Sequence, residues 1–272
     1  MTNAAPHPVE LQYTGGGFAE RILEAAKAAG VETITADALG PADEFHTGGI
    51  RATRELAKLA GFEPGARVLD IGSGLGGPAR VLAGEFGCDV TGIDLTAEFV
   101  RSATALTQAC GLSERARFQV GNALALEFAD ASFEGAWTQH VVMNIEDRAT
   151  FYREIARVVK PGAKFAFFDI LRGPNPAPLD YPVPWANEPS ISFLYDEAQT
   201  RKFVEQAGFE VVAWNVVPQQ SVVLGAQAAA QQGAGLTLEI VLGGNLGDRI
   251  RNVAAAAADE RLILLQALCR RR

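Results

Sequence analysis

Apolar and polar positions alternate in two ways along the middle of the chain. Short apolar runs of the kind that form buried strands occur at 67–72, 89–94, 117–123, 133–140 and 164–171. Stretches with apolar residues at helical spacing lie between several of these runs, at 78–86, 97–110 and 148–160. Strands that alternate with helices in this order predict an α/β fold with a doubly wound, mostly parallel sheet.

The two ends of the chain add elements around this unit. Helical patterns at 17–30 and 50–60 precede the first strand. A helix at 196–208 follows the fifth strand, and apolar runs at 209–217 and 262–269 add two more strands. The sequence therefore predicts a sheet of seven strands with helices in front of it in the chain.

Two irregular segments interrupt the later part of the pattern. Residues 172–185 contain five prolines, a density that predicts an excursion away from the sheet. Residues 219–258 are rich in glutamine, alanine and glycine. We therefore expect an N-terminal tail and helical lid at 1–49 and a main domain at 50–272, with cap insertions at about 172–195 and 219–258. The N-terminal helices and the insertions are expected to form a lid together.

Composition narrows the classes of function. Hydrophobic residues make up 48% of the chain and charged residues 21%, which allows a large buried core. The net charge is −8. A nucleic-acid binder needs a basic surface, so we expect no nucleic-acid partner.

The three cysteines and the apolar runs bear on the cellular compartment of the protein. Cys88, Cys110 and Cys269 are widely and irregularly spaced, which predicts free thiols in a reducing compartment such as the cytoplasm. No run of 18 apolar residues occurs and the first ten residues do not resemble a secretory signal, so we expect no contact with a membrane. The sequence does not fix the oligomeric state, and a homodimer is possible.

The central chemical signal is the glycine-rich stretch VLDIGSGLGGPAR at 68–80. Glycines there allow a tight turn and a close approach of a ligand to the backbone, at the carboxyl end of a strand where α/β proteins bind ligands. The spacing of Gly72, Gly74 and Gly77 also satisfies the dinucleotide pattern. Asp70 favours another ligand, because its carboxylate would repel a pyrophosphate and attract an ammonium or a sulfonium group.

A second carboxylate ends the next strand. Asp94, in the stretch VTGIDL, can accept hydrogen bonds from both hydroxyls of a ribose. Leu95, directly after it, can pack on an adenine ring. Both residues serve either nucleoside ligand and do not discriminate between them.

With these motifs the sequence resembles the class I S-adenosylmethionine-dependent methyltransferases. Their glycine motif matches Asp70 to Gly76, their ribose-binding strand end matches GIDL, and their adenine-side and later segments match 120–137 and 157–169. The resemblance covers roughly 50–215 and the last strand. It is strongest to the small-molecule group that includes sarcosine/dimethylglycine and ubiquinone-pathway enzymes.

The resemblance implies a cofactor, S-adenosylmethionine, and the residues that bind it. Asp70 would hold the methionine ammonium group, and Asp94 the ribose. Family members usually carry an acid on the adenine side where this chain has Asn122, whose amide oxygen can accept the same hydrogen bond. The implied cofactor-binding residues are Asp70, Gly72, Ser73, Gly74, Asp94, Leu95, Asn122, Ala123 and Gln139.

The implied activity is transfer of a methyl group to nitrogen, oxygen or carbon of a small molecule by in-line displacement. One alternative keeps the fold and the cofactor but catalyses a non-methylating reaction such as cyclisation. The other alternative is a nicotinamide-dependent oxidoreductase. Asp70 and the motifs that follow it in the sequence argue against this alternative.

The candidate catalytic residues are His140, which follows the fourth strand beside the expected position of the methyl group, and His46 in the turn DEFHTGG. Either could act as a general base. Tyr13, Tyr181 and Trp185 are candidate substrate-binding residues, because aromatic side chains line pockets and can face cations.

Other polar residues are not expected to act. Adjacent residues on a turn point apart, so Asp43 and Glu44 are expected to form a solvated acidic turn. Trp137 is expected to pack inside the fourth strand. No spacing of histidines and carboxylates fits a metal site, and no catalytic metal is expected.

Overall fold

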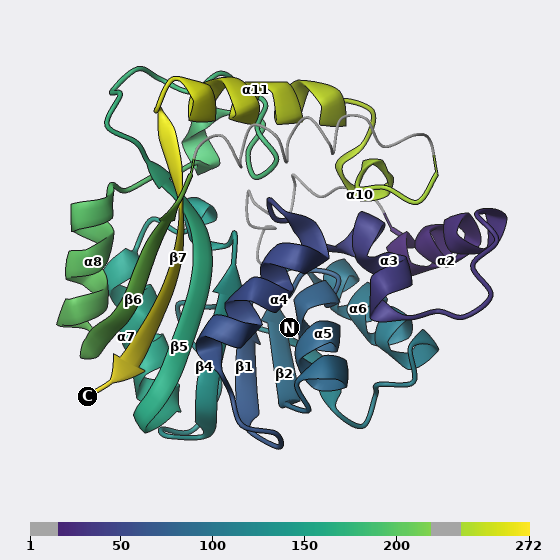
Figure 1. The fold of residues 1–272 in the computed structure, drawn as a ribbon, viewed down its shortest axis with the longest axis horizontal. Helices are drawn as coiled ribbons and strands as arrows, with labels where there is room; N and C mark the ends of the chain where they lie inside the picture. Colours follow the sequence, from purple (N-terminus) through teal and green to yellow (C-terminus); the bar gives the residue numbers. More distant parts are fainter. Residues whose placement is uncertain (1–15, 219–234) are drawn as a thin grey trace, which may run out of the picture.

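A sheet of seven strands forms the centre of the molecule, in the order β3-β2-β1-β4-β5-β7-β6 (Figure 1). The computed structural model describes residues 16–218 and 235–272. The strands are β1 (Arg67–Ile71), β2 (Asp89–Asp94), β3 (Ala116–Val120), β4 (Phe133–Gln139), β5 (Val159–Arg172), β6 (Phe209–Val217) and β7 (Leu262–Arg271). β1 to β5 pair in parallel, and β7 runs antiparallel to both β5 and β6. The predicted α/β fold with a mostly parallel, seven-stranded sheet is confirmed.

Helices cover both faces of this sheet, as a doubly wound fold requires. Their bounds are α4 (Gly49–Ala60), α5 (Gly77–Glu85), α6 (Ala97–Ala109), α7 (Arg148–Val158) and α8 (Glu197–Gln206). Figure 1 shows α4 and α5 crossing in front of β1 and β2, while α7 lies behind the sheet. Strand β5 begins at Val159, earlier than the apolar run alone predicts, because Val159 already pairs with Phe133 of β4. An irregular stretch with a positive φ of 78° at Gly162 separates this pair from the regular pairing that starts at Lys164.

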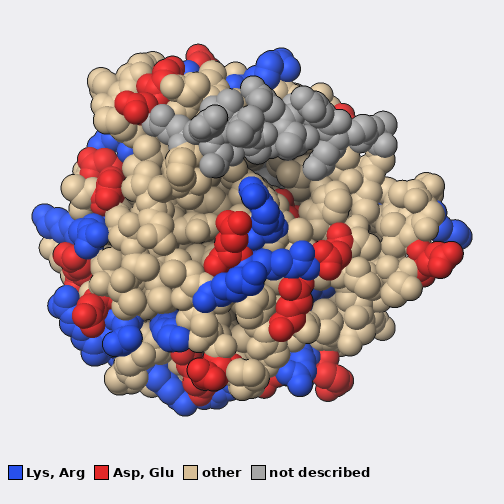
Figure 2. Space-filling view, viewed as in Figure 1, with Lys and Arg blue, Asp and Glu red and all other residues tan. Residues whose placement is uncertain are grey.

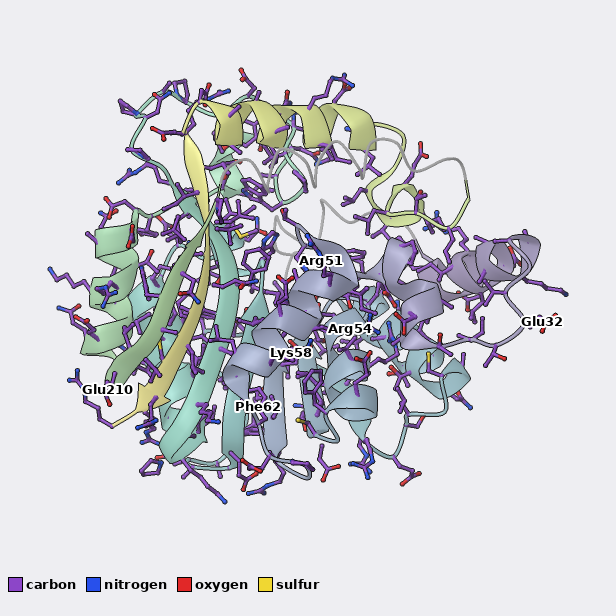
Figure 3. All side chains as sticks on the ribbon, in the orientation of Figure 1. Glu32, Arg51, Arg54, Lys58, Phe62 and Glu210 are labelled. Atoms are coloured by element: carbon purple, nitrogen blue, oxygen red, sulfur yellow. The ribbon has the colours of Figure 1, made fainter. Side chains whose placement is uncertain are left out.

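The central strands are buried between these helices. Trp137 on β4 is fully buried, as expected from the sequence. Its ring lies 6.5 Å from that of Phe62, which follows α4 and is labelled in Figure 3. A Cβ atom on Gly135 would lie only 2.4 Å from the Phe62 ring, so this position admits only glycine. Close packing of this kind fixes α4 against the sheet.

Two N-terminal helices form a second, smaller core. They are α2 (Phe18–Ala28) and α3 (Ala36–Asp43), and Thr35 caps α3 by accepting a hydrogen bond from the N–H of Ala38. Phe18 and Leu39 pack there with Phe99 of α6. The helix α3 was not among the helices expected from the sequence. The expected tail and Tyr13 lie outside the described residues.

The later insertions lie over the carboxyl ends of the parallel strands. They contain η2 (Pro189–Ile191), α10 (Glu239–Leu242) and α11 (Leu246–Ala258), and Figure 1 shows α11 crossing above the sheet. We call the segments 174–193 and 239–258 the cap. Residues 219–234 of the second predicted insertion lie outside the described part of the chain. No helix among the described residues is long and apolar enough to cross a membrane.

Hydrogen bonds tie the two segments of the cap to each other and to the main domain. Arg249 of α11 donates to the backbone oxygen of Val183 and to the side chain of Asn187. Asn252, also on α11, donates to the backbone oxygen of Pro182. From the main domain, Asn144 after β4 donates to the backbone oxygens of Trp185 and Ile191, each at 2.8 Å. These bonds fix the proline-rich segment in one conformation.

Charged side chains are mixed on the face seen in Figure 2, where acidic and basic groups lie next to each other. On α4, Arg54 pairs with Asp37 and with Glu85, each at 2.7 Å. Figure 3 shows Arg54 with Arg51 and Lys58 along the outer side of this helix. The basic residues of this helix are therefore neighbours of acids and do not form a separate basic stripe.

Candidate active site

The glycine-rich loop between β1 and α5 closely contacts two other segments. Gly72 and Gly74 have positive φ angles of 72° and 52°, which glycine adopts at little cost. A Cβ atom on Gly72 would lie 2.4 Å from Cγ2 of Val141, after β4. A Cβ atom on Gly77 would lie 2.9 Å from the backbone oxygen of Asp43, at the end of α3. The glycines therefore allow the loop, α3 and the segment after β4 to converge.

Asp94 connects this loop to the end of β2. Its Oδ2 accepts a hydrogen bond of 2.9 Å from the N–H of Gly74, and its Oδ1 accepts one of 2.8 Å from the N–H of Thr96. Because both oxygens are held by backbone groups, the orientation of the carboxylate is fixed. It faces the same cavity as the loop.

That cavity, of about 600 Å³, lies at the carboxyl ends of the parallel strands. Its volume falls within the range typical of small-molecule sites. It brings together residues that the sequence predicted separately: His46, Gly72, Ser73, Gly74, Asp94, Leu95, Asn122, Ala123, Gln139, His140 and Trp185.

Two of the remaining predicted residues are described but do not line the cavity. Tyr181 is half-buried and packs against the main core, because the chain turns inward before Val183. Asp70 is only 2% exposed and lies at the end of β1, below the glycine loop. The structure thus removes Tyr181 from the cavity wall and gives Asp70 an interior position.

Burial dominates the electrostatics of Asp70. The desolvation of its carboxylate, together with the nearby charges of Glu44 and Asp94, raises the pKa of Asp70 to about 8. Within the described part of the chain, its Oδ2 has no hydrogen-bond partner. A buried carboxyl group beside two other carboxylates favours a cation in its neighbourhood.

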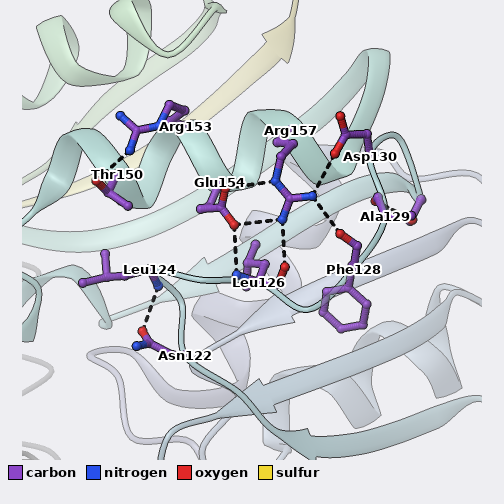
Figure 4. Close-up of polar contacts among 11 residues, drawn as sticks. Asn122, Leu124, Leu126, Phe128, Ala129, Asp130, Thr150, Arg153, Glu154 and Arg157 are labelled. Carbon is purple, nitrogen blue, oxygen red and sulfur yellow. Dashed lines mark hydrogen bonds and ion pairs between the residues drawn. The ribbon is translucent and has the colours of Figure 1, made fainter.

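The adenine-side segment after β3 is held rigidly. Asn122 uses its Oδ1 to accept a hydrogen bond of 2.9 Å from the N–H of Leu124 (Figure 4). Arg157 of α7 donates to the backbone oxygens of Leu126 and Phe128 and pairs with Glu154. The Asn122 oxygen, which the sequence assigned to the adenine amino group, thus also closes a local turn.

Two histidine rings face each other at the cavity. Their centroids are 5.9 Å apart in an edge-to-face arrangement, and His140 also lies 4.9 Å from the ring of Phe168. His140, directly after β4, has a positive φ of 51°, an uncommon backbone conformation for a residue other than glycine. Burial, and to a lesser extent His46, lowers the pKa of His140 well below its usual value. This ring is therefore neutral at neutral pH.

His46 belongs to a buried polar cluster. Its Nε2 lies 2.5 Å from Oε2 of Glu44 and 2.9 Å from the hydroxyl of Thr53 on α4. The Thr53 hydroxyl also lies 2.8 Å from the same Glu44 oxygen and 3.2 Å from Oε1 of Gln139. A carboxylate that accepts from Nε2 selects the tautomer in which Nδ1 carries no proton. Nδ1 itself lies 3.4 Å from the backbone oxygen of Thr47.

The expectation of a solvated acidic turn is wrong. Asp43 and Glu44 are each 3% exposed. Asp43 forms a buried ion pair with Arg80 of α5, which also donates to the backbone oxygen of Leu75 in the glycine loop. Desolvation, opposed in part by Arg80, raises the pKa of Asp43 to about 6. The turn is buried because α3 packs directly on the loop.

Sequence reasoning missed Glu44 and Thr53. A signal for Glu44 existed, since side chains two positions apart in extended backbone lie on one side, and Glu44 stands two residues before His46. Thr53 carried no signal, because its role depends on the placement of α4.

One domain family matches the part of the chain that builds most of this site. Residues 69–167 match the family described as "Methyltransferase domain". Methyltransferase phqN from Penicillium fellutanum is 31% identical over 180 residues, which are 64% of this chain and 55% of that protein. The chain spans about half the length of the curated relatives that it matches.

Solved structures share the fold. The crystal structure of the [4+2]-cyclase SpnF is 26% identical, covers 81% of this chain and 80% of its own, and has a TM-score of 0.61. The structure of geranyl diphosphate methyltransferase in complex with GPP and sinefungin is 15% identical and has a TM-score of 0.72. The match covers 98% of this chain and 100% of that chain. The latter likeness concerns the fold alone.

The fold and the family match bear on the class of protein. Residues 69–167 match the methyltransferase domain family, and the chain shares its seven-stranded fold with solved methyltransferases. Both findings agree with the resemblance seen in the sequence.

Proposed function

We propose that the chain is an enzyme that transfers the methyl group of S-adenosylmethionine to a small-molecule acceptor. The observation that carries this proposal is the buried Asp70 carboxyl group, which lies below the glycine loop with one oxygen unpartnered among the described residues. The cofactor bears an ammonium and a sulfonium group, both of which lower the cost of ionising Asp70. A nicotinamide dinucleotide would bring a pyrophosphate to the same place and raise that cost.

Further observations support the fit of this cofactor. Gln139, which lines the cavity at the end of β4, has a buried Nε2 without a partner in 16–218 and 235–272. That amide would donate to the methionine carboxylate. Gly72, Ser73 and Gly74 would line the methionine part, Asp94 would bind the ribose, and the segment Asn122–Ala123 would flank the adenine.

The bound cofactor supplies an activated methyl group on a sulfonium, so the protein's own residues have to position the acceptor and exclude water. The cap would provide that exclusion, with Trp185 on its inner side. His46 and His140 lie on the cavity wall, where either could take a proton from an acceptor. His140 is neutral at neutral pH and can act as a base without first losing a proton.

The similarity to the cyclase SpnF favours a second candidate function. SpnF covers most of this chain at 26% identity, and a cyclase of this fold would use the same cavity. Methyl transfer remains the better supported function, because the family match and the curated relatives are methyltransferases.

The first test is a calorimetric titration of the purified protein with S-adenosylmethionine and, separately, with NAD. We expect micromolar binding of S-adenosylmethionine and none of NAD. Screening phenols, amines and acids for formation of S-adenosylhomocysteine then separates the two candidate functions. Conversion of an acceptor with the methyl group retained on the cofactor would favour the cyclase. Binding of NAD alone would overturn the proposal.

We also propose that residues 1–49 and the cap act as one lid over the main domain, and that the protein is cytoplasmic and without a nucleic-acid partner. The three cysteines are all free, with Cys88 and Cys269 buried, which agrees with a reducing compartment. Size-exclusion chromatography with light scattering would test the homodimer.

A further inference from the structure

The side of the cavity that faces the cap is built from apolar walls. Its lining residues there are Ile170, Pro184, Trp185, Ser190, Ile191, Phe193, Leu242 and Val253. The indole N–H of Trp185 donates to Ser192 at 2.9 Å, so the ring presents only its apolar surface. The side-chain amide of Asn144 is engaged by the backbone of the cap. The polar groups nearest this wall are thus used by the protein itself.

No lysine or arginine lines the cavity in the described part of the chain. The two buried arginines near the cap serve it structurally. Arg249 donates to Val183 and Asn187, and Arg148 donates to the backbone oxygens of Ile145 and Phe193. The residues 1–15 and 219–234 contain no lysine or arginine at all. Nη1 of Arg148 has no hydrogen-bond partner among the described residues, but Arg148 is not part of the cavity wall. No side-chain guanidinium or ammonium group of the described residues therefore lines the cavity to neutralise an anionic acceptor.

The carboxylates are unevenly placed as well. Asp94 and Asp43 line the cavity at the glycine loop and α3. Glu146 and Asp147 also line it but are exposed. Glu44 is not part of the wall and acts on it only through His46. A cationic acceptor would lack a buried carboxylate on the cap side.

We propose that the acceptor is an uncharged, largely apolar aromatic molecule with one acidic hydroxyl group, which lies against Trp185 and points its hydroxyl at His46. The proposal rests on the proposed function and adds the substrate class. It departs from the phosphorylated ligand of the geranyl diphosphate methyltransferase complex, which shares the fold.

The proton and the electrons can be followed in this reaction. The hydroxyl proton passes to Nδ1 of His46, which lies 3.4 Å from the backbone oxygen of Thr47. The resulting positive charge is stabilised by the Glu44 carboxylate 2.5 Å from Nε2. An oxygen lone pair forms the new bond to the methyl carbon. The electron pair of the carbon–sulfur bond stays on sulfur, which loses its charge. Glu44 is thus a positioning residue for His46.

The first experiment compares two probes with the same ring on the native protein. The protein, saturated with S-adenosylhomocysteine, is titrated with 4-nitrophenol and with 4-nitrophenyl phosphate. We expect the phenol to bind at least about tenfold more tightly, because the phosphate would be buried without a cation. Equal or tighter binding of the phosphate would overturn the proposal, and so would binding of neither probe. Failure to bind S-adenosylhomocysteine would instead count against the proposed function.

A second experiment measures proton transfer from the bound probe to the protein in the absence of methyl transfer. The ionised form of 4-nitrophenol absorbs visible light, so the ionised fraction of the bound probe reports on proton transfer to the protein. We expect this fraction to fall severalfold in His46→Gln and to a smaller degree in Glu44→Gln, while the probe still binds. Glu55→Gln is the matched control, since it makes the same change from carboxylate to amide at an exposed position of α4 and should leave the ionised fraction unchanged. An unchanged fraction in His46→Gln would refute the role of His46.

Discussion

Asp94 at the end of β2 accepts a hydrogen bond of 2.9 Å from the N–H of Gly74 in the loop after β1. The two strand ends that would hold the ribose and the methionine part of the cofactor are therefore linked before any ligand arrives. Replacement of Asp94 by Ala removes this link and the proposed acceptor for the ribose hydroxyls.

We expect Asp94→Ala to weaken the binding of S-adenosylmethionine by about 10- to 100-fold, because hydrogen bonds to a charged group contribute roughly 1.5–3 kcal/mol each. Isothermal titration calorimetry measures this directly. Asp89→Ala, at the exposed opposite end of the same strand, is the control and should leave the affinity unchanged. An affinity of Asp94→Ala within twofold of the native protein would contradict the assignment.

Asp70 should make the ligand-free protein less stable as the pH rises. Its pKa is raised to about 8 from an ordinary value of 3.8. Between these values the folded protein keeps a proton that the unfolded chain has released, so the free energy of unfolding falls with pH across that window. Asp43 and Asp169, whose pKa values are raised to about 6, add to the slope mainly below pH 6.

Asp70→Asn should remove the part of the slope between pH 6.5 and 8 and stabilise the ligand-free protein at pH 8 by on the order of 2 kcal/mol. The same variant should bind S-adenosylmethionine more weakly, since it cannot pair with the ammonium group. Urea unfolding at several pH values, with and without the cofactor, tests both statements. A variant as pH-dependent as the native protein would show that another group causes the slope.

The buried ion pair between Asp43 and Arg80 should be far more important for stability than an exposed one. Arg80→Met leaves the Asp43 carboxylate buried without its partner, and we expect a loss of roughly 3–5 kcal/mol in the free energy of unfolding. The double variant Asp43→Asn, Arg80→Met should recover part of the lost free energy of unfolding. Arg54→Ala, which breaks two exposed pairs with Asp37 and Glu85, should cost less than about 1 kcal/mol.

Denaturant unfolding of these variants at pH 7.5 gives the comparison. Equal losses for Arg80→Met and Arg54→Ala would mean that water reaches the Asp43 carboxylate in the folded protein. Such a result would also weaken the link between α3 and the glycine loop.

The fold and the convergence of the glycine loop and Asp94 on one cavity could be predicted from the sequence because their signals are local. The glycine loop and Asp94 each follow a strand directly, and the topology brings the strand ends together. The helix α3 was missed because Gly40 and Pro41 lower its intrinsic propensity, while Leu39 packs in the N-terminal core and stabilises it.

The histidine cluster could not be assembled in this way. Glu44, Thr53 and Gln139 come from three segments, and their meeting depends on how α4 packs over the sheet. Asp43 and Glu44 have the composition of a solvated turn, and only the distant Arg80 reveals otherwise. The sequence also could not show that Tyr181 packs against the main core, because an aromatic residue in a proline-rich segment can pack inward as readily as it lines a pocket.

The last prediction concerns the cap. Arg249 on α11 donates to Val183 and Asn187, which flank Trp185 in the chain, and Val183 in turn pairs with Ala186 through two backbone hydrogen bonds. Arg249 therefore holds the turn that carries Trp185 from a different segment, together with Asn144 and Asn252. Arg249→Ala should loosen this turn while the strand ends proposed to hold the cofactor keep their contacts.

We expect Arg249→Ala to speed amide hydrogen exchange at Val183 and Ala186 by at least about tenfold, which corresponds to roughly 1.4 kcal/mol of local stability. Binding of 4-nitrophenol should weaken by a similar factor, and binding of S-adenosylhomocysteine should change less than about twofold. Arg251→Ala, whose side chain is exposed on the same helix and pairs with Asp248, should leave all three quantities unchanged. If Arg249→Ala weakened both ligands equally, the cap would be part of the cofactor site and not a separate wall for the acceptor.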